Sequence, residues 1–254
     1  MKVLPLFKSH YSLGKSILTL EEPTDKKGKP VEGSIFHLLQ SNKIDTLTLV
    51  DDNVSGLLQA SKVADENKIK LVFGFRISIV NDMTEKNDEA LKKVAKYIIF
   101  VKSPAAYQKL IKIWSVAAKD GFYYEPKIDF KTLKTHWDDK LLLLAIPFYD
   151  SFLYLNSYES HIHVPDFGFT KPVIFIENND LPFDNFPAEK VEKFSKDNGL
   201  GLVPTQSIYY EKHKDFLAYL TRRCIDNRTT VEKPELPHMA SNEFCFEKWL
   251  NLNK

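Results

Sequence analysis

His161 and His163 have the His-x-His spacing at which two imidazole side chains could hold one metal ion. In a β-strand, residues two positions apart point to the same side, so both rings could reach one ion. However, no recognisable motif places a carboxylate partner beside them, and the segment reads as a loop before Pro165. We therefore interpret the two histidines as a solvated pair rather than as metal ligands.

The sequence contains no specific motif for nucleophilic catalysis or phosphate binding, and only a weak indication of base stacking. No serine lies in the glycine pattern of a nucleophile elbow, so a Ser-His-Asp triad is disfavoured. The nine glycines are scattered and form no phosphate-cradling loop. Trp114, Phe122, Tyr123 and Tyr124 could stack on bases, but core packing and a turn explain them better. The KKGK segment at residues 26–29 could touch phosphate, although a short charged loop tip is usually just solvated.

Composition indicates an ordinary globular chain of the reducing cytosol. The 254 residues are 43% hydrophobic and 27% charged, with a formal net charge of +1, so any contact with nucleic acid would have to come from a local patch. The two cysteines, Cys224 and Cys245, lack paired metal-type spacing. The N-terminus is too polar for a signal peptide, and no apolar run approaches a membrane span. We expect a cytoplasmic protein with no membrane contact.

Short apolar runs alternate with helical patterns along the chain. Strands are predicted at residues 2–7, 46–50, 71–80 (broken at Gly74), 97–101, 141–146, 173–177 and 200–203. Helices are predicted from the N-cap Ser34, and at residues 56–67, from the Ser103-Pro104 cap, 188–197 and 212–224. This alternation predicts an α/β fold with a parallel sheet, and roughly seven units favour a closed barrel. We see no internal linker, and the charged segment at residues 21–33 is expected to be an exposed insertion.

An ordered series of motifs resembles the PHP (polymerase and histidinol phosphatase) domain of bacterial DNA polymerase III alpha subunits. The series covers nearly the whole chain and consists of SHYSL (9–13), TLVDDNVSGLLQA (48–60), KIKLVFGFRI (68–77), the segment 98–133 with its YYEPKID turn, and VPTQSIYY (203–210). The resemblance implies a distorted, seven-stranded TIM-like (β/α)7 barrel in a single PHP domain spanning residues 1–254.

The same resemblance implies that the family's metal site has degenerated. Active PHP proteins hold up to three metals with His, Asp and Glu at the C-terminal rim of the barrel. Carried over position by position, those ligands fall on Leu6, Lys8, Lys15, Asp52, Arg76, Tyr97, Ser207 and Tyr209, and the acidic Asp51 is kept. Lys8, Lys15 and Arg76 would place cations where the family places metal ions, which repels divalent metal. We expect no catalytic residues, no metal and no other cofactor.

The resemblance therefore favours a catalytically inactive structural and protein-interaction module of a polymerase III alpha-type replication machinery. Its expected partners are other polymerase III alpha domains and, as in some bacteria, the proofreading exonuclease, with only indirect association with DNA. A free-standing regulator that binds a host replication protein is a further interpretation. The alternative from another class is a metal-dependent phosphoesterase or 3′–5′ exonuclease with a rebuilt site. For the vacated site we expect an ion-pair network in which Arg76 contacts Asp51 or Asp52.

Overall fold

The computed structural model describes residues 2–182, 184–233 and 241–253, which form two compact units. Of these described residues, the first unit comprises 2–73, 177–182, 184, 204–233 and 241–253, and the second comprises 74–176 and 185–203. The boundaries between the two units fall inside two strands, β3 (Lys70–Val80) and β8 (Gly201–Ile208), so each strand has residues in both units. Within the described part of the chain, no helix combines the length and apolar character needed to cross a bilayer.

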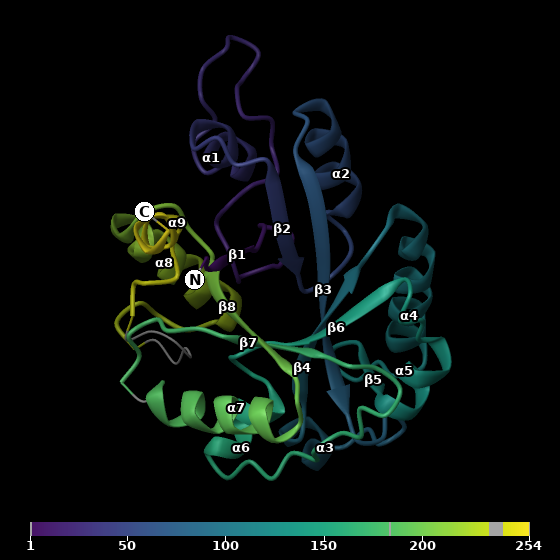
Figure 1. The fold of residues 1–254 in the computed structure, drawn as a ribbon. Coiled ribbons are helices and arrows are strands. Elements are labelled where there is room, and N and C mark those ends of the chain that lie inside the picture. The colour runs from purple at the N-terminus through teal and green to yellow at the C-terminus, as the bar shows by residue number, and fades with distance from the viewer. Residues whose placement is uncertain (1, 183, 234–240, 254) are drawn as a thin grey trace. The chain divides into compact units, whose positions relative to one another are not determined.

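The first unit is built on parallel strand pairs. β1 (Leu4–Phe7) pairs in parallel with both β2 (Thr46–Asp51) and β8, so the carboxyl ends of these strands point the same way. The termini lie close together in this unit (Figure 1), because the indole of Trp249 and the amide side chain of Asn253 both bond to the backbone of Val3. Its other elements are β1 (Leu4–Phe7), α1 (Ile35–Ser41), β2 (Thr46–Asp51), α2 (Leu57–Glu66), η2 (His213–Asp215), α8 (Phe216–Asn227) and α9 (Phe246–Leu252).

The second unit contains a mixed group of strands flanked by helices. β6 pairs in parallel with β7 and β3 with β5, whereas β4 is antiparallel to both β3 and β6. Its elements, besides the parts of β3 and β8, are α3 (Asp88–Lys92), β4 (Ala95–Val101), η1 (Pro104–Ala106), α4 (Tyr107–Lys119), β5 (Lys127–Asp129), α5 (Phe130–His136), β6 (Leu142–Ile146), α6 (Phe152–Ser157), β7 (Val173–Ile176) and α7 (Asn185–Asp197).

The strand order confirms the expected fold class. It runs β2-β1-β8-β7-β6-β4-β3, and β2 is also paired with β3, so the order of seven strands closes on itself. With helices in the connections, this is a distorted TIM-like α/β barrel of the PHP type. The expectation of a purely parallel sheet is wrong at β4. The connection from β3 to β4 carries only α3, which has no buried residue, whereas a parallel crossover normally needs a helix that packs back on the sheet.

The predicted break at Gly74 is also wrong, since β3 is one strand of eleven residues. A Cβ atom at Gly74 would lie 2.6 Å from Cε1 of Phe100 on the paired strand β4. The glycine therefore makes room for an aromatic ring within the strand pair and does not end the strand. Four short helices and β5 were not predicted, because each is too short to show a clear hydrophobic period: α3, α5, α6 and α9.

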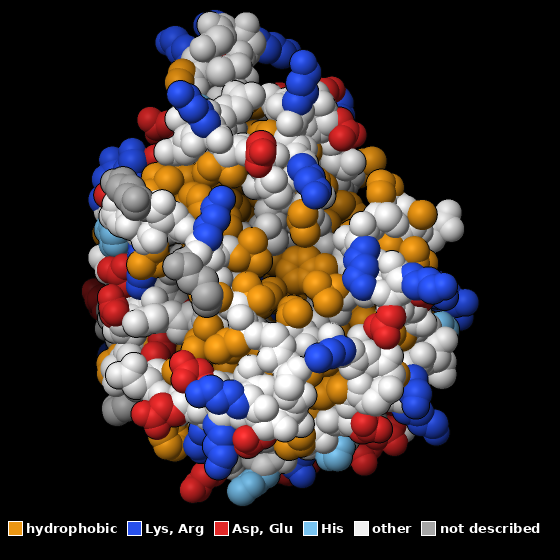
Figure 2. Space-filling view, viewed as in Figure 1, with side chains coloured by type: hydrophobic (Ala, Val, Ile, Leu, Met, Phe, Trp, Pro, Cys, Tyr) orange, Lys and Arg blue, Asp and Glu red, His pale blue; other side chains and the backbone are white. Residues whose placement is uncertain are grey.

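Three of the predicted helix boundaries agree with the structure. Ser34 caps α1, where its hydroxyl accepts a hydrogen bond from the amide of His37. α2 begins after Gly56, and α7 ends before Gly199, whose φ of 59° is the left-handed conformation that terminates helices. The segment 21–33 is exposed except at the buried Pro23 and the half-buried Val31 and Gly33, and Figure 2 shows blue side chains on its projecting tip.

Candidate functional site

Four residues predicted for the vestigial site gather at the carboxyl ends of parallel strands in the first unit. Lys8 follows β1, Asp51 ends β2, Asp52 comes next, and Ser207 lies near the end of β8. The register pairs Leu6 with Ser207, and Phe7 with Leu49 two residues before Asp51. In barrels of parallel strands, this edge is where functional side chains are found. We call Lys8, Asp51, Asp52 and Ser207, together with Glu177 described below, the rim cluster.

Asp51 is fully buried and is held by serine donors. Its Oδ1 accepts the backbone amide of Ser9 at 2.9 Å and the hydroxyl of Ser12 at 2.7 Å, and its Oδ2 accepts the hydroxyl of Ser9 at 2.7 Å. A carboxylate offers about four lone-pair positions, so three of them are already used. The SHYSL segment thus folds over Asp51 as a cap of hydrogen-bond donors.

Lys8 and Asp52 form an ion pair beside this cap. Nζ of Lys8 lies 2.6 Å from Oδ1 of Asp52, and the Lys8 side chain is only 5% exposed whereas that of Asp52 is 29% exposed. The backbone amide of Asp52 donates to the hydroxyl of Ser12, which joins the pair to the Asp51 cap. The position that the resemblance aligns with a histidine ligand therefore carries a buried ammonium group paired with Asp52.

Glu177 is a member of the rim cluster that the sequence analysis missed as a site residue. It follows β7 directly and is buried, and its Oε1 accepts the hydroxyl of Ser207 at 2.8 Å while its Oε2 accepts the Ser207 amide at 3.0 Å. Asn179 also donates to Oε2 at 3.0 Å. The signal was present in the sequence, because an acidic residue directly after an apolar run marks a strand end in the same way as Asp51.

The other first-unit positions that the resemblance singled out offer no ligand of the family's kind. Leu6 is buried in β1, and the half-buried Lys15 lies in the loop that follows the SHYSL segment. The ring of Tyr209 stacks between Tyr219 at 5.7 Å and Phe244 at 5.5 Å between ring centroids. Burial assigns Leu6 to packing, and the ring contacts do the same for Tyr209.

Arg76 and Tyr97 belong to the second unit, each with partners there. Nη2 of Arg76 lies 2.9 Å from Oδ2 of Asp150 and donates to the carbonyl oxygen of Tyr149 at 3.0 Å. Asp150 is thus a partner of Arg76 that the sequence analysis did not name. A contact of Arg76 with Asp51 or Asp52 joins residues of different units and stays a prediction.

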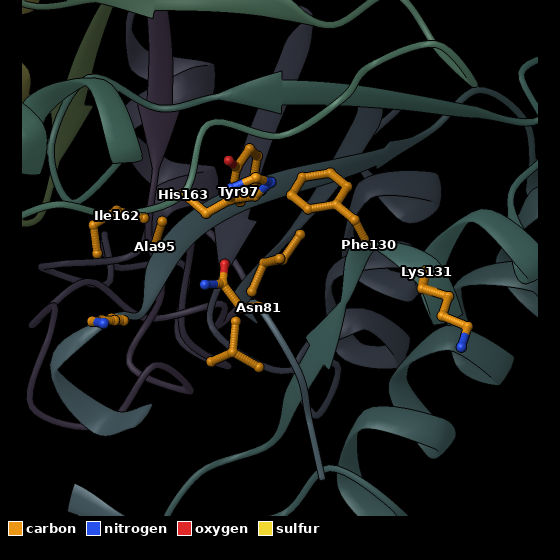
Figure 3. A pocket seen from close by; sticks show the side chains of 10 residues that line it. Asn81, Ala95, Tyr97, Phe130, Lys131, Ile162 and His163 are labelled. Carbon is orange, nitrogen blue, oxygen red and sulfur yellow. The ribbon is translucent and has the colours of Figure 1, made fainter. Parts of the chain in front are cut away.

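Tyr97, which the resemblance aligns with a family histidine, lines a pocket of about 120 Å³. Its ring meets Phe130 edge-on at 5.2 Å, and burial raises its pKa well above the usual range, so the phenol is neutral. In Figure 3 the Lys131 side chain points away from these two rings. His163 lines the pocket as well, and both His161 and His163 are exposed, in agreement with a solvated pair.

The residues present do not fit the family's metal centre. Divalent ions need lone pairs from imidazole, carboxylate or thiolate groups. In the rim cluster, the Asp51 oxygens are bound by serine donors, those of Glu177 by Ser207 and Asn179, and Asp52 by an ammonium group. Across the part of the chain that the structure describes, no three His, Cys, Asp or Glu side chains are grouped so that they could hold an ion. We therefore derive no step through a metal.

Comparison with known proteins gives the same family as the motifs. The PHP domain family matches residues 33–165. DNA polymerase III subunit alpha of Thermus aquaticus is 25% identical over 202 residues, which cover 76% of this chain and 16% of that protein. The same subunit of Treponema pallidum (strain Nichols) is 22% identical over 211 residues, covering 79% of this chain and 18% of the relative. That of Chlamydia muridarum is 32% identical over 105 residues, covering 40% and 8%.

The chain thus spans less than a fifth of the length of these relatives. The family match covers more than half of the 254 residues, and the motifs and the closed seven-strand order agree with it. The chain belongs to the PHP domain family.

Proposed function

We propose that the chain is a single PHP domain, residues 1–254 with an exposed insertion at 21–33, that has lost hydrolytic activity. In this proposal it acts as a structural and protein-interaction module of a DNA polymerase III alpha-type replication machinery in the cytoplasm. Support comes from the family match and from relatives that carry the name DNA polymerase III subunit alpha. Proposed partners are further domains of such a subunit and a proofreading exonuclease, with DNA associated indirectly.

The observation that carries the loss of activity is the Lys8–Asp52 ion pair beside the serine-capped Asp51. Hydrolysis of a phosphate ester by this family needs metal to activate water and to neutralise the charge that develops on phosphate. An ammonium group supplies a positive charge but has no lone pair for a metal and cannot activate water while protonated. The rim cluster can therefore keep the strand ends in register without supporting hydrolysis.

The test combines metal binding with an activity assay on the 254-residue chain. After equilibration with Mn²⁺ and Zn²⁺ followed by desalting, elemental analysis should find no stoichiometric metal, and a chelator should leave the melting temperature unchanged. Labelled single-stranded DNA and a generic phosphate monoester should persist in excess Mn²⁺. The matched control is Asp52→Asn, which separates a rebuilt site from a contaminant. Turnover that copurifies with the protein and disappears in Asp52→Asn would instead establish the phosphoesterase alternative.

A further inference from the structure

α4 and α5 are rich in lysine, although the chain as a whole has almost no net charge. The chain as a whole has a net charge of +1, yet residues 102–119 contain four lysines and residues 130–136 two lysines and a histidine, with no aspartate or glutamate in either stretch. α4 and α5 pack against each other within the second unit. Figure 2 shows blue side chains along the right edge of the view, where Figure 1 places these two helices.

The lysines of α4 share one side of the helix. Leu110, Ile113 and Ala117 are buried, which fixes the inward face. Lys109, Lys112 and Lys119 lie at positions i, i+3 and i+10, so at 100° per residue they fall within about 80° of one another. Ten residues of helix rise about 15 Å, so these charges form a row rather than a point. On α5, Lys134 is exposed and His136 is half-buried.

Two lysines of α4 influence the titration of a histidine at the end of α5. Partial burial, followed by the positive charges of Lys112 and Lys109, lowers the pKa of His136. His136 therefore lies within the field of the α4 lysines. We define the basic face as Lys109, Lys112, Lys119 and Lys134, with His136 beside them.

The acidic residues around this face lie at the helix ends: Asp120 directly follows Lys119 at the end of α4, and Asp129, Asp138 and Asp139 flank α5. Among the described residues, none of its four lysines forms an ion pair with a carboxylate. The nearby Asp129 caps α5 and Asp139 accepts hydrogen bonds from Trp137 and Thr170, so both are engaged at helix ends. Lys131 is left out of the face because its charge contributes to lowering the pKa of Asp82, after the hydrogen bonds from Thr84.

We propose that the basic face of α4 and α5 binds the phosphate backbone of DNA directly and without sequence specificity. The row of flexible ammonium groups suits phosphates, which are spaced about 3.4 Å apart along a strand. A protein partner would need an apolar anchor at the centre of the contact. Of the described residues in α4 and α5, only Tyr107 is a large apolar side chain that is exposed, and it lies at the start of α4. This contact goes beyond the indirect association proposed above and does not depend on it.

The test measures binding of a labelled 30-base-pair duplex, and of a single strand of equal length, to the 254-residue chain by fluorescence anisotropy from low to moderate salt. The test variant is Lys109→Gln/Lys112→Gln/Lys134→Gln. The matched control, Lys26→Gln/Lys27→Gln/Lys29→Gln, removes the same charge from the exposed loop tip. We expect the test variant to lose about tenfold or more in affinity, and the slope of log K against log salt to fall by about 2–3 in magnitude. The control should change affinity less than about twofold.

Three outcomes would overturn the proposal. The first is that the parent chain does not bind DNA at low salt. The second is equal loss in both triple variants, which would indicate attraction by net charge alone. The third is competition by a polyglutamate peptide as effective as that by unlabelled DNA of equal charge, which would assign the face to an acidic protein. Circular dichroism and thermal melting of both variants exclude unfolding as the cause of a loss.

Discussion

Ser9 donates both its backbone amide and its hydroxyl to the buried carboxylate of Asp51, at 2.9 and 2.7 Å. The arrangement fixes the turn after β1 against the end of β2, because one acceptor satisfies two donors of the same residue. Ser12 adds a third donor to the same carboxylate. The carboxylate of Asp51, which the resemblance assigns to the vestigial site, is thus the centre of a structural hydrogen-bond cluster.

Asp51→Ala should destabilise the protein more than any single serine substitution in the cap. The change leaves three buried donors without their acceptor, and we expect a loss of about 3–5 kcal/mol in the free energy of unfolding. Ser12→Ala removes one donor and should cost about 1–2 kcal/mol. Asp51→Asn should lie between them, because the hydroxyl groups can rotate to accept from the amide. Urea unfolding measures all three, and an Asp51→Ala loss no larger than that of Ser12→Ala would contradict this account.

The Lys8–Asp52 pair predicts a difference between removing one partner and removing both. Lys8 is nearly buried, so Asp52→Ala removes the carboxylate that balances its positive charge. This substitution should lower the free energy of unfolding by about 1–3 kcal/mol. Lys8→Met with Asp52→Leu replaces both charges by apolar groups and should cost less than Asp52→Ala alone. The two variants and the parent are compared by urea unfolding at neutral pH. A double variant less stable than Asp52→Ala would show that the ion pair itself is the stabilising element.

The fold was largely predictable from the sequence because its strands are apolar runs bounded by caps and turns. Ser34 and Gly199 mark helix ends through local rules of capping and left-handed conformation that need no tertiary information. β4 was misjudged in direction, since strand direction depends on what lies in the connection and on its ability to cover the sheet. Local periodicity contains no information on pairing partners.

The rim cluster was predictable only in part, for a related reason. Lys8, Asp51, Asp52 and Ser207 were found because family motifs place them at strand ends. Glu177 bonds to Ser207 across 30 positions of sequence, and Asp150 bonds to Arg76 across 74. Such long-range partners follow from three-dimensional packing, so no motif or spacing in the sequence connects them.

Gly74→Ala should destabilise the protein, in contrast to an alanine at Gly201. A Cβ at position 74 would approach Cε1 of Phe100 to 2.6 Å, so the ring or the strand pair must shift, at a cost of about 1–3 kcal/mol. At Gly201 nothing lies within 4 Å of the added Cβ, and the backbone is not left-handed. Gly201→Ala should therefore be neutral or stabilise by about 0.4–1 kcal/mol. Thermal melting of the two variants provides the comparison, and equal melting temperatures would exclude the steric explanation.

His213 should give the first unit a stability that depends on pH. Its Nδ1 lies 2.9 Å from Oε2 of Glu247 in α9, and its Nε2 lies 3.3 Å from Oε1 of Glu243, so both nitrogens face carboxylates. Partial burial lowers the pKa of His213, but hydrogen bonds to Glu247 and Glu243 outweigh it and leave the pKa raised. Both nitrogens can donate only in the protonated ring, which is why the pairing favours the cation.

A histidine whose pKa is higher in the folded than in the unfolded state stabilises the folded state. This stabilisation is complete below the unfolded pKa of about 6.5 and is lost as the pH rises through the folded pKa. His213→Gln should remove that contribution, so the stability difference between parent and variant should shrink from pH 5.5 to pH 8.5. The matched control is His163→Gln, an exposed histidine that should leave the parent's pH profile unchanged. Urea unfolding at several pH values measures both. A parent–variant difference that stays constant, or grows towards pH 8.5, would show that His213 is not held as the cation between Glu243 and Glu247.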